Sequence, residues 1–384
     1  MTSRRLLFYC QHSLGLGHLA RSLRLAEALA GEFDVVLLNG GRFPPGARVD
    51  PRIEVVALPP LGHDEQHKLV SHDRRLTVDQ AKQLRRDALL DALDRCDPAV
   101  LLVEMYPFGR RKFEFELLPL LRAARRPGGP RIVCSVRDIL VSRREDQAAY
   151  DERIRARVEE FFDAVLVHSD PAFARLSESF APMNPLLVPV HHTGFVAPPI
   201  PTFRSAERRL LVSAGGGMVG EPLVRAAVEV HGELAARTGL TTTVVAGPFL
   251  PEPAWRRLAA AAAGSASLSA VRQVDDLCAE IAASTLSLSQ CGYNTAMDLL
   301  RAGTPAVVVP YAEGDEDEQT RRAQRLQDLG VLRSVPAARL TSELLLAALL
   351  GVASGRERTQ LDLSGAGATA RLLAALRTTH GVPA

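Results

Sequence analysis

The sequence predicts an α/β protein made of two doubly wound, Rossmann-like domains that face each other across a cleft. Three observations predict this class. Short β-branched or leucine-rich runs alternate with longer amphipathic stretches, which is typical of parallel strands buried beneath helices. The chain has 384 residues, more than one domain usually takes. The alternation stops at a proline-rich stretch, 188–201, and then begins again.

The first half of the chain carries the alternation in the order that a parallel sheet needs. Its apolar runs have the length and composition of buried strands, and the stretches between them show one apolar face. We expect strands at Arg5–Cys10, Asp34–Leu38, Ile53–Leu58, Ala99–Val103, Arg131–Val136 and Asp163–Val167. We expect helices at Ala20–Ala30, Val78–Arg95, Phe115–Arg125 and Tyr150–Phe162.

The second half repeats the class of the first. We expect strands at Arg209–Ser213, Thr242–Ala246, Ser267–Val271, Thr285–Ser289 and Ala306–Val309, and a terminal helix at Ala366–Arg377. The domains are therefore set at 1–190 and 208–384, the latter including the terminal helix, with a proline-rich interdomain linker at 191–207. Ligands of doubly wound domains bind at the carboxyl ends of the strands, so the crevice between two such sheets is the expected site.

Composition excludes several classes of function. With 46 Lys and Arg against 44 Asp and Glu, the net charge of +2 does not favour nucleic acid as the main partner. No lysine precedes Ser or Thr, so a P-loop is absent. The five scattered cysteines form no CxxC and indicate a reducing cytoplasm. No apolar run approaches about 18 residues, so no transmembrane segment is expected, and peripheral membrane contact stays open.

A glycine loop follows the first expected strand. Gly15 and Gly17 allow a tight turn and close approach of a phosphate or acceptor, and the amides of the next helix favour negative charge. With Ala20 they also fit a dinucleotide-binding pattern, but the second strand ends without a carboxylate for a ribose. A plain strand-to-helix turn is the simpler alternative. It leaves His18, at the exit of the loop, without an explanation.

A second glycine loop, Gly215, Gly216 and Gly217, follows the first strand of the second domain. Three consecutive glycines are costly in chain entropy, which favours a phosphate or sugar passing close to the backbone over a plain turn.

The segment from Ser289 to Pro305 carries the most specific pattern: strand, glycine turn, helix and glycine stop. Asn294 or Thr295 can cap the helix, so that the amides from Gly292 onward point at an anion. Asp298 lies one turn inside on the face of Asn294, where its carboxylate could accept hydrogen bonds from two ribose hydroxyls. Pyrophosphate beside ribose describes a nucleotide sugar.

Val271–Leu329 resembles the donor-binding half of GT-B glycosyltransferases, above all the MurG-type family (glycosyltransferase family 28) and its plant and antibiotic relatives. The residues that carry the resemblance are Gly292, Asn294, Thr295, Asp298, Pro310, Tyr311, Glu318 and Gln319. It implies a GT-B fold with an acceptor-side domain at 1–190 and a donor-binding domain at 208–384. Asp298 stands where the family commonly has Glu, which shortens the reach of the carboxylate.

The same resemblance implies further roles. The backbone at Val274 would hold the nucleobase, Glu318 and Gln319 would bind the donor, and residues 215–217 would be the second-domain glycine loop. His18 matches the histidine of the family's first-domain glycine loop. Leu101–Arg110 resembles a strand-end signature in a bacterial branch of predicted glycosyltransferases, for which no acceptor is implied.

Glycosyl transfer needs a base for the acceptor and stabilisation of the departing diphosphate. His18, which titrates near neutrality, is the first candidate for the base, and Glu104 at a strand end is the second. A salt bridge from Glu104 to Arg110 or Arg111 is an equally good interpretation of that carboxylate.

Metal binding is the rival to this scheme. Asp315 and Asp317 form an Asp-x-Asp pattern that could hold a divalent cation, although clustered loop acids are more often solvated. Five other histidines were considered as metal ligands, but they lack Cys or carboxylate partners at ligand spacing. They are interpreted as surface residues: His63, His67, His72, His191 and His192.

The sequence therefore predicts a cytoplasmic, metal-independent glycosyltransferase without a cofactor. The family resemblance implies that the reaction inverts the anomeric configuration of the sugar. It would move a sugar from a UDP- or dTDP-sugar to a hydroxyl or amine of a small-molecule or lipid-linked acceptor. A sugar-nucleotide 2-epimerase of the same fold and a catalytically silent sugar-nucleotide-binding partner remain the alternatives. The oligomeric state is left open.

Overall fold

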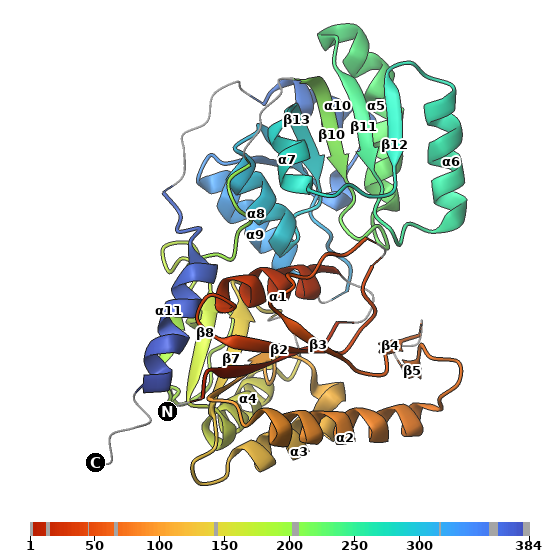
Figure 1. Cartoon of the computed structure of the whole chain (residues 1–384). Helices are drawn as coiled ribbons and strands as arrows, with labels where there is room; N and C mark the ends of the chain where they lie inside the picture. Colours follow the sequence, from red (N-terminus) through yellow and green to blue (C-terminus); the bar gives the residue numbers. More distant parts are fainter. Residues whose placement is uncertain are drawn as a thin grey trace. The chain divides into compact units, whose positions relative to one another are not determined.

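The computed structural model describes residues 3–12, 16–44, 46–64, 68–141, 145–201, 207–314, 316–352 and 360–378. The chain forms two compact units (Figure 1). The first is drawn from residues 1–140, 145–196 and 362–384, and the second contains residues 197–361. Each is a parallel sheet with helices on its faces, which confirms the predicted fold class.

The first unit is built on a seven-stranded parallel sheet in the order β3-β2-β1-β6-β7-β8-β9. Its strands are β1 (Arg5–Cys10), β2 (Asp34–Asn39), β3 (Glu54–Ala57), β6 (Val100–Glu104), β7 (Arg131–Arg137), β8 (Ala164–His168) and β9 (Val190–His192). A separate hairpin pairs β4 (Leu61–His63) with β5 (Leu69–Ser71). The helices are α1 (Leu16–Leu29), α2 (Val78–Cys96), α3 (Glu114–Ala124), α4 (Gln147–Phe161) and α11 (Gly365–Thr378).

The two faces of this sheet bury alternate residues of each strand, as the period of two requires. Leu7 and Tyr9 of β1 pack in the core beneath α2, α3 and α4. Leu6 and Phe8 pack on the opposite face, in the core shared with α1 and α11. Both faces are thus covered, which explains why the strands are continuous apolar runs in the sequence.

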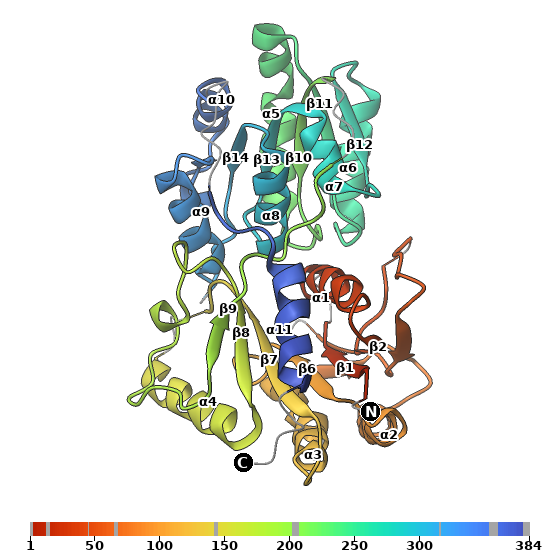
Figure 2. The same ribbon diagram turned by 60° about the vertical axis from the view of Figure 1, so that its left-hand side comes forward.

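The terminal helix belongs to the first unit. The sequence-based division, which assigned it to the second domain, was wrong at this point. Leu373 of α11 lies in the same buried cluster as Leu25 and Leu29 of α1, and the two helices lie side by side (Figure 2). The expected linker also begins too early, because β9 pairs with β8. The chain returns to this unit where Phe195 N donates to Asp362 O at 2.7 Å. These are long-range contacts that local sequence patterns do not report.

The second unit has a six-stranded parallel sheet in the order β12-β11-β10-β13-β14-β15. Its strands are β10 (Glu207–Ser213), β11 (Thr241–Val245), β12 (Leu268–Val271), β13 (Ser284–Ser289), β14 (Ala306–Val308) and β15 (Arg333–Ser334). Its helices are α5 (Glu221–Thr238), α6 (Glu252–Ala263), α7 (Leu277–Ala282), α8 (Tyr293–Ala302), α9 (Glu318–Asp328) and α10 (Ser342–Leu350). The doubly wound class thus recurs, as the sequence predicts.

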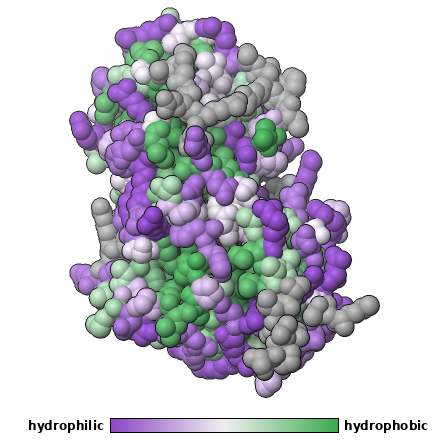
Figure 3. Space-filling model, turned by 90° about the vertical axis from the view of Figure 1, so that its left-hand side faces the viewer, coloured by the Kyte–Doolittle hydropathy of each residue, from purple (hydrophilic) through white to green (hydrophobic). Residues whose placement is uncertain are grey.

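In the described part of the chain, no helix is both long enough and apolar enough to span a membrane. The face in Figure 3 shows separate hydrophobic areas among hydrophilic ones.

Because every strand of each main sheet runs parallel, the loops at the carboxyl ends gather at one edge in each unit. The expected site residues His18, Glu104 and Gly292 lie at or just beyond these ends.

Candidate functional site

The first unit joins the two candidate bases in one hydrogen bond. β1 pairs with β6, and the first turn of α1 lies beside Glu104, the last residue of β6. His18, in the first turn of α1, places Nδ1 2.6 Å from Oε1 of Glu104. Arg21, one turn further along α1, donates to the same oxygen. Arg110 adds a longer ion pair, with Nη2 3.5 Å from Oε2 of Glu104.

Electrostatics decides which of the two groups takes a proton. Burial alone would raise the pKa of Glu104, but interactions with His18, Arg110 and Arg21 hold it well below its usual range. Burial lowers the pKa of His18 to about 3, with the charge of Arg110 acting in the same direction and Glu104 opposing it. At neutral pH Glu104 is therefore a carboxylate and His18 a neutral imidazole.

The pairing fixes the tautomer of His18. A carboxylate has no proton to donate, so Nδ1 of His18 must be the donor and Nε2 carries the free lone pair. The His18 side chain keeps 22% of its surface exposed, whereas Glu104 is fully buried. Nε2 of His18 is thus able to take up a proton, and the hydrogen bond to Glu104 orients the ring. The sequence offered His18 and Glu104 as alternative bases, and a salt bridge to Arg110 as another role for Glu104. In the structure, Glu104 contacts both His18 and Arg110.

The backbone after β6 is held in an unusual conformation. Met105 and Arg110 both have φ of 64°, in the left-handed region that residues with a side chain seldom adopt. Such strained positions gather where function needs a fixed geometry. Here they frame the segment that presents Glu104 and Arg110 to His18.

A second polar cluster lies on the same sheet edge and was not singled out from the sequence. Nε2 of His168, at the end of β8, lies 2.7 Å from Oγ of Ser135, and its Nδ1 lies 2.9 Å from Oγ1 of Thr193. All three residues are buried. Burial lowers the pKa of His168 to about 3, and Arg21 acts in the same direction. Its place at a strand end was the one available signal.

In the second unit, the turn into α8 has the open geometry of a ligand contact. Gly292 is the N-cap, with φ −62° and ψ 157°, and makes no side-chain cap bond. The expectation that Asn294 or Thr295 caps the helix is therefore wrong, because both lie inside its first turn. A Cβ on Gly292 would meet no atom within 4 Å, and its φ suits any residue. The fold itself does not require glycine here, which favours close approach of a ligand.

The three-glycine loop has two kinds of glycine. Gly217, with φ of 89°, would bring a Cβ to 2.6 Å from the Ala246 carbonyl oxygen, so the fold demands a glycine there. Gly215 has φ of 58°, and a Cβ there would make only an ordinary contact, 3.7 Å from Oε1 of Gln290. Gly216 has neither a positive φ nor a close neighbour. A Cβ built on it would lie 3.8 Å from the Phe249 ring. Packing thus accounts for Gly217, whereas it does not require a glycine at position 216.

The other expected donor residues surround this sheet edge. Asp298 is 4% exposed in the second turn of α8, and Val274 is half-buried in the loop before α7. Glu318 and Gln319 begin α9. Oε1 of Gln319 accepts hydrogen bonds from the amides of Cys291, at 3.0 Å, and Tyr311, at 3.2 Å.

Several expected residues lie elsewhere. Gly15 and Asp315 are outside the described residues, and Gly17 is exposed in the first turn of α1. Asp317, the N-cap of α9, has Oδ2 3.8 Å from Nη1 of Arg321. The described residues contain no group of three or more His, Cys, Asp or Glu arranged to hold a metal ion.

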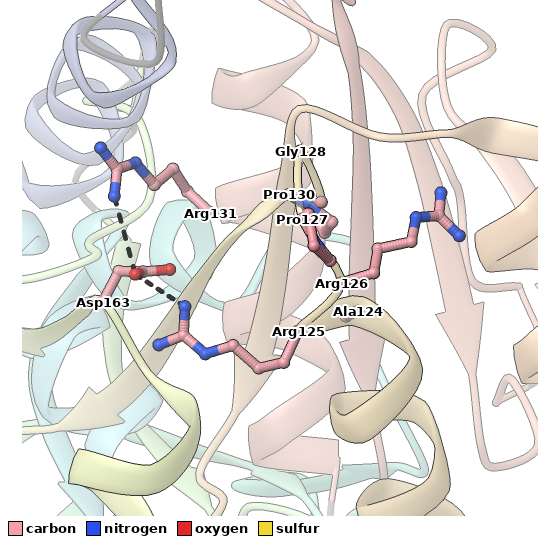
Figure 4. Close-up of a pocket in the computed structure, with 9 residues that line it drawn as sticks. Ala124, Arg125, Arg126, Pro127, Gly128, Pro130, Arg131 and Asp163 are labelled. Atoms are coloured by element: carbon pink, nitrogen blue, oxygen red, sulfur yellow. Dashed lines mark hydrogen bonds and ion pairs between the residues drawn. The ribbon is translucent and has the colours of Figure 1, made fainter. Parts of the chain in front are cut away.

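A surface pocket of the first unit lies at the opposite edge of its sheet. Residues 124–131 and Asp163 line it, at the amino ends of β7 and β8 (Figure 4). Arg125 donates to Asp163 at 2.9 Å, and Arg131 pairs with the same oxygen at 3.7 Å. Arg125 and Arg131 thus share one carboxylate, and the pocket is remote from the strand ends that carry His18 and Glu104.

Comparison with known proteins finds a family model that matches part of the chain. The model of the glycosyltransferase family 28 C-terminal domain matches residues 215–374. Over 109 residues, the chain is 33% identical to the UDP-N-acetylglucosamine–N-acetylmuramyl-(pentapeptide) pyrophosphoryl-undecaprenol N-acetylglucosamine transferase of Shewanella amazonensis, covering 28% of this chain and 29% of that protein. The enzyme of the same name from Solibacter usitatus is 37% identical over 70 residues, 18% of this chain and 19% of that one. The chain thus aligns with less than a third of the length of these relatives.

Solved structures match almost the whole chain. The calicheamicin glycosyltransferase CalG4 superposes with a TM-score of 0.59 and 17% identity, over 99% of this chain and 96% of that one. MurG of Acinetobacter baumannii gives a TM-score of 0.55 and 15% identity, over 98% and 99%. At these identities the likeness shows the fold. The chain has the GT-B glycosyltransferase fold, and its residues 215–374 match the model of the family 28 C-terminal domain.

Proposed function

We propose that this protein transfers a sugar from a UDP- or dTDP-sugar to a hydroxyl or amine of a small-molecule or lipid-linked acceptor. The observation that carries the proposal is that the family 28 match covers the open Gly292 turn. The first unit supplies the other requirement, a neutral imidazole whose Nε2 is free to take a proton. All five cysteines are buried and none of them forms a disulfide, which supports a reducing, cytoplasmic location.

The proposed reaction is a single displacement. The acceptor oxygen or nitrogen forms a bond to the anomeric carbon, the bond from that carbon to the phosphate oxygen breaks, and the nucleoside diphosphate leaves with the electron pair. Nε2 of His18 takes the acceptor's proton, and the carboxylate of Glu104 stabilises the imidazolium that results. One displacement inverts the anomeric configuration.

The leaving diphosphate would be held by the start of α8. The amides of its first turn and the helix dipole favour negative charge. Asp298 would bind the ribose, and the backbone at Val274 the base. The carbonyl of Gln319 is already used by two amides, so its NH₂ group is the part we assign to the sugar, beside Glu318.

A two-step screen tests the activity. Thermal shift with a panel of nucleotide sugars identifies the donor, and mass detection of products with candidate acceptors identifies the reaction. A new glycoside confirms the transferase. Conversion of UDP-GlcNAc to its 2-epimer without an acceptor would point to the epimerase, and tight binding without turnover to the silent partner.

Asp298→Ala is expected to weaken binding of UDP or dTDP by about 1.5–3 kcal/mol, the range for a hydrogen-bonded charged acceptor. Calorimetry measures the change. Asp298→Asn should lose less, because the amide still accepts one bond. Asp328→Ala removes an exposed carboxylate of α9 and is the matched control. Unchanged affinity in the Asp298→Ala variant would remove the ribose assignment.

Turnover is expected to survive EDTA, because helix amides and the glycine turn would carry the leaving group without a cation. Asp315→Ala combined with Asp317→Ala should keep most of the activity in the same assay. Loss of activity on chelation, with recovery on addition of Mg²⁺ or Mn²⁺, would establish the Asp-x-Asp alternative instead.

A further inference from the structure

Helix α9 holds the turn that precedes α8 through two side chains on one face. Arg322, three residues after Gln319, is fully buried. Its Nη1 donates to the carbonyl oxygen of Cys291 at 2.9 Å. Gln319 accepts from the amide of the same residue at 3.0 Å. Both peptide groups that flank the Cα of Cys291 are thus tied to α9.

The bond to Arg322 determines where the next amide points. The peptide between Cys291 and Gly292 is trans, since the cis peptide bond in the described chain is Tyr106–Pro107. In a trans peptide the C=O and N–H groups point in opposite directions. Because the carbonyl of Cys291 points to Arg322, the N–H of Gly292 points away from Arg322.

That amide is available to a ligand. Within the described part of the chain, the N–H of Gly292 donates to no acceptor. The space beside its Cα is open, with no atom within 4 Å of a Cβ placed there. The guanidinium of Arg322 lies 5.8 Å from the centroid of the Tyr293 ring, which adds a second contact to the same turn. A buried cation behind the turn also favours an anion in front of it.

We propose that Arg322, assisted by Gln319, is a positioning residue that aims the Gly292 amide at the diphosphate of the donor. The inference rests on the proposed function and deepens it. Arg322 touches the turn and not the ligand, so its effect is specific to the phosphates. Loss of the Arg322 side chain should therefore leave the binding of the base and the ribose of the donor unchanged.

The test compares a nucleoside diphosphate with its nucleoside. Binding of UDP and uridine, and of dTDP and thymidine, is measured by calorimetry and by NMR titration into the millimolar range. Arg322→Gln is expected to weaken the diphosphate about tenfold and the nucleoside less than about twofold. Arg322→Lys, which keeps the charge, should recover part of the loss. Arg321→Gln, its neighbour on α9, is the matched control and should change neither.

Other results are equally informative. A role in folding alone would lower the melting temperature and weaken nucleoside and diphosphate by the same factor, which would overturn the inference. If Arg322→Gln does not fold, Gln319→Met removes the other bond and should again weaken the diphosphate selectively. A wild-type protein that binds neither diphosphate would overturn the proposed function, whereas wild-type binding with an unchanged ratio in both variants would overturn this inference alone.

Discussion

His18→Ala is expected to lower turnover by about 10²–10⁴, the usual share of general-base catalysis, and to leave the affinity for the nucleoside diphosphate nearly unchanged. The reason is that Nε2 of His18 is the group with a free lone pair, whereas the donor residues lie in the second unit. Because the neutral form is active and burial lowers the pKa of His18 to about 3, protonation of His18 should cause no loss of rate between pH 8 and 5. Initial rates and calorimetry measure both quantities.

Two controls sharpen this result. Added imidazole should restore part of the rate in His18→Ala, because the cavity left by the side chain can take the missing base. His231→Ala removes a half-buried histidine of α5 and should keep the wild-type rate. A retained rate in His18→Ala would move the role of base to another group, with Glu104 the first to examine.

Glu104→Gln is expected to damage both turnover and stability. The carboxylate lies between His18 and Arg21, and the variant removes the buried negative charge with which the Arg21 guanidinium pairs. Removing one member of a buried ion pair costs about 3–5 kcal/mol of unfolding free energy. Turnover should fall by about 10²-fold or more, because an amide NH₂ can donate to Nδ1 and move the imidazole proton to Nε2. Denaturant unfolding and initial rates measure the two effects.

Glu114→Gln is the matched control, since this residue is a half-buried carboxylate nearby in the chain that accepts a hydrogen bond from the Tyr106 hydroxyl. It should change neither quantity by much. A Glu104→Gln variant that is less stable but turns over normally would make Glu104 a structural residue and would leave His18 without an orienting partner.

The sequence predicts the fold well because the parallel strands are short apolar runs and the helices between them keep one apolar face. It also finds His18, Glu104 and the Gly292 turn, each at a strand end. It cannot pair His18 with Glu104, because that depends on β6 lying next to β1 although β2, β3, β4, β5, α1 and α2 separate them in the chain. Arg21 was missed for the same reason, although its spacing of three from His18 was a signal.

Other differences come from packing at a distance. Nothing local in the sequence places α11 against α1, and the division into 1–190 and 208–384 failed at that point. The run of three glycines gave no sign that Gly217 meets the loop after β11, which requires one glycine for a reason unrelated to ligands. Arg322 carried no motif, since its role follows from the fold of α9 against the Cys291 turn.

A double-mutant cycle on turnover tests whether His18 and Glu104 act as one unit in glycosyl transfer. Transfer rates are measured for wild type, His18→Ala, Glu104→Gln and the double variant, with the donor saturating. We predict that the double variant is no slower than His18→Ala within about threefold, because Glu104 acts through the imidazole that is already gone. Losses that multiply, so that the double variant is slower by the product of the two single effects, would contradict the claim.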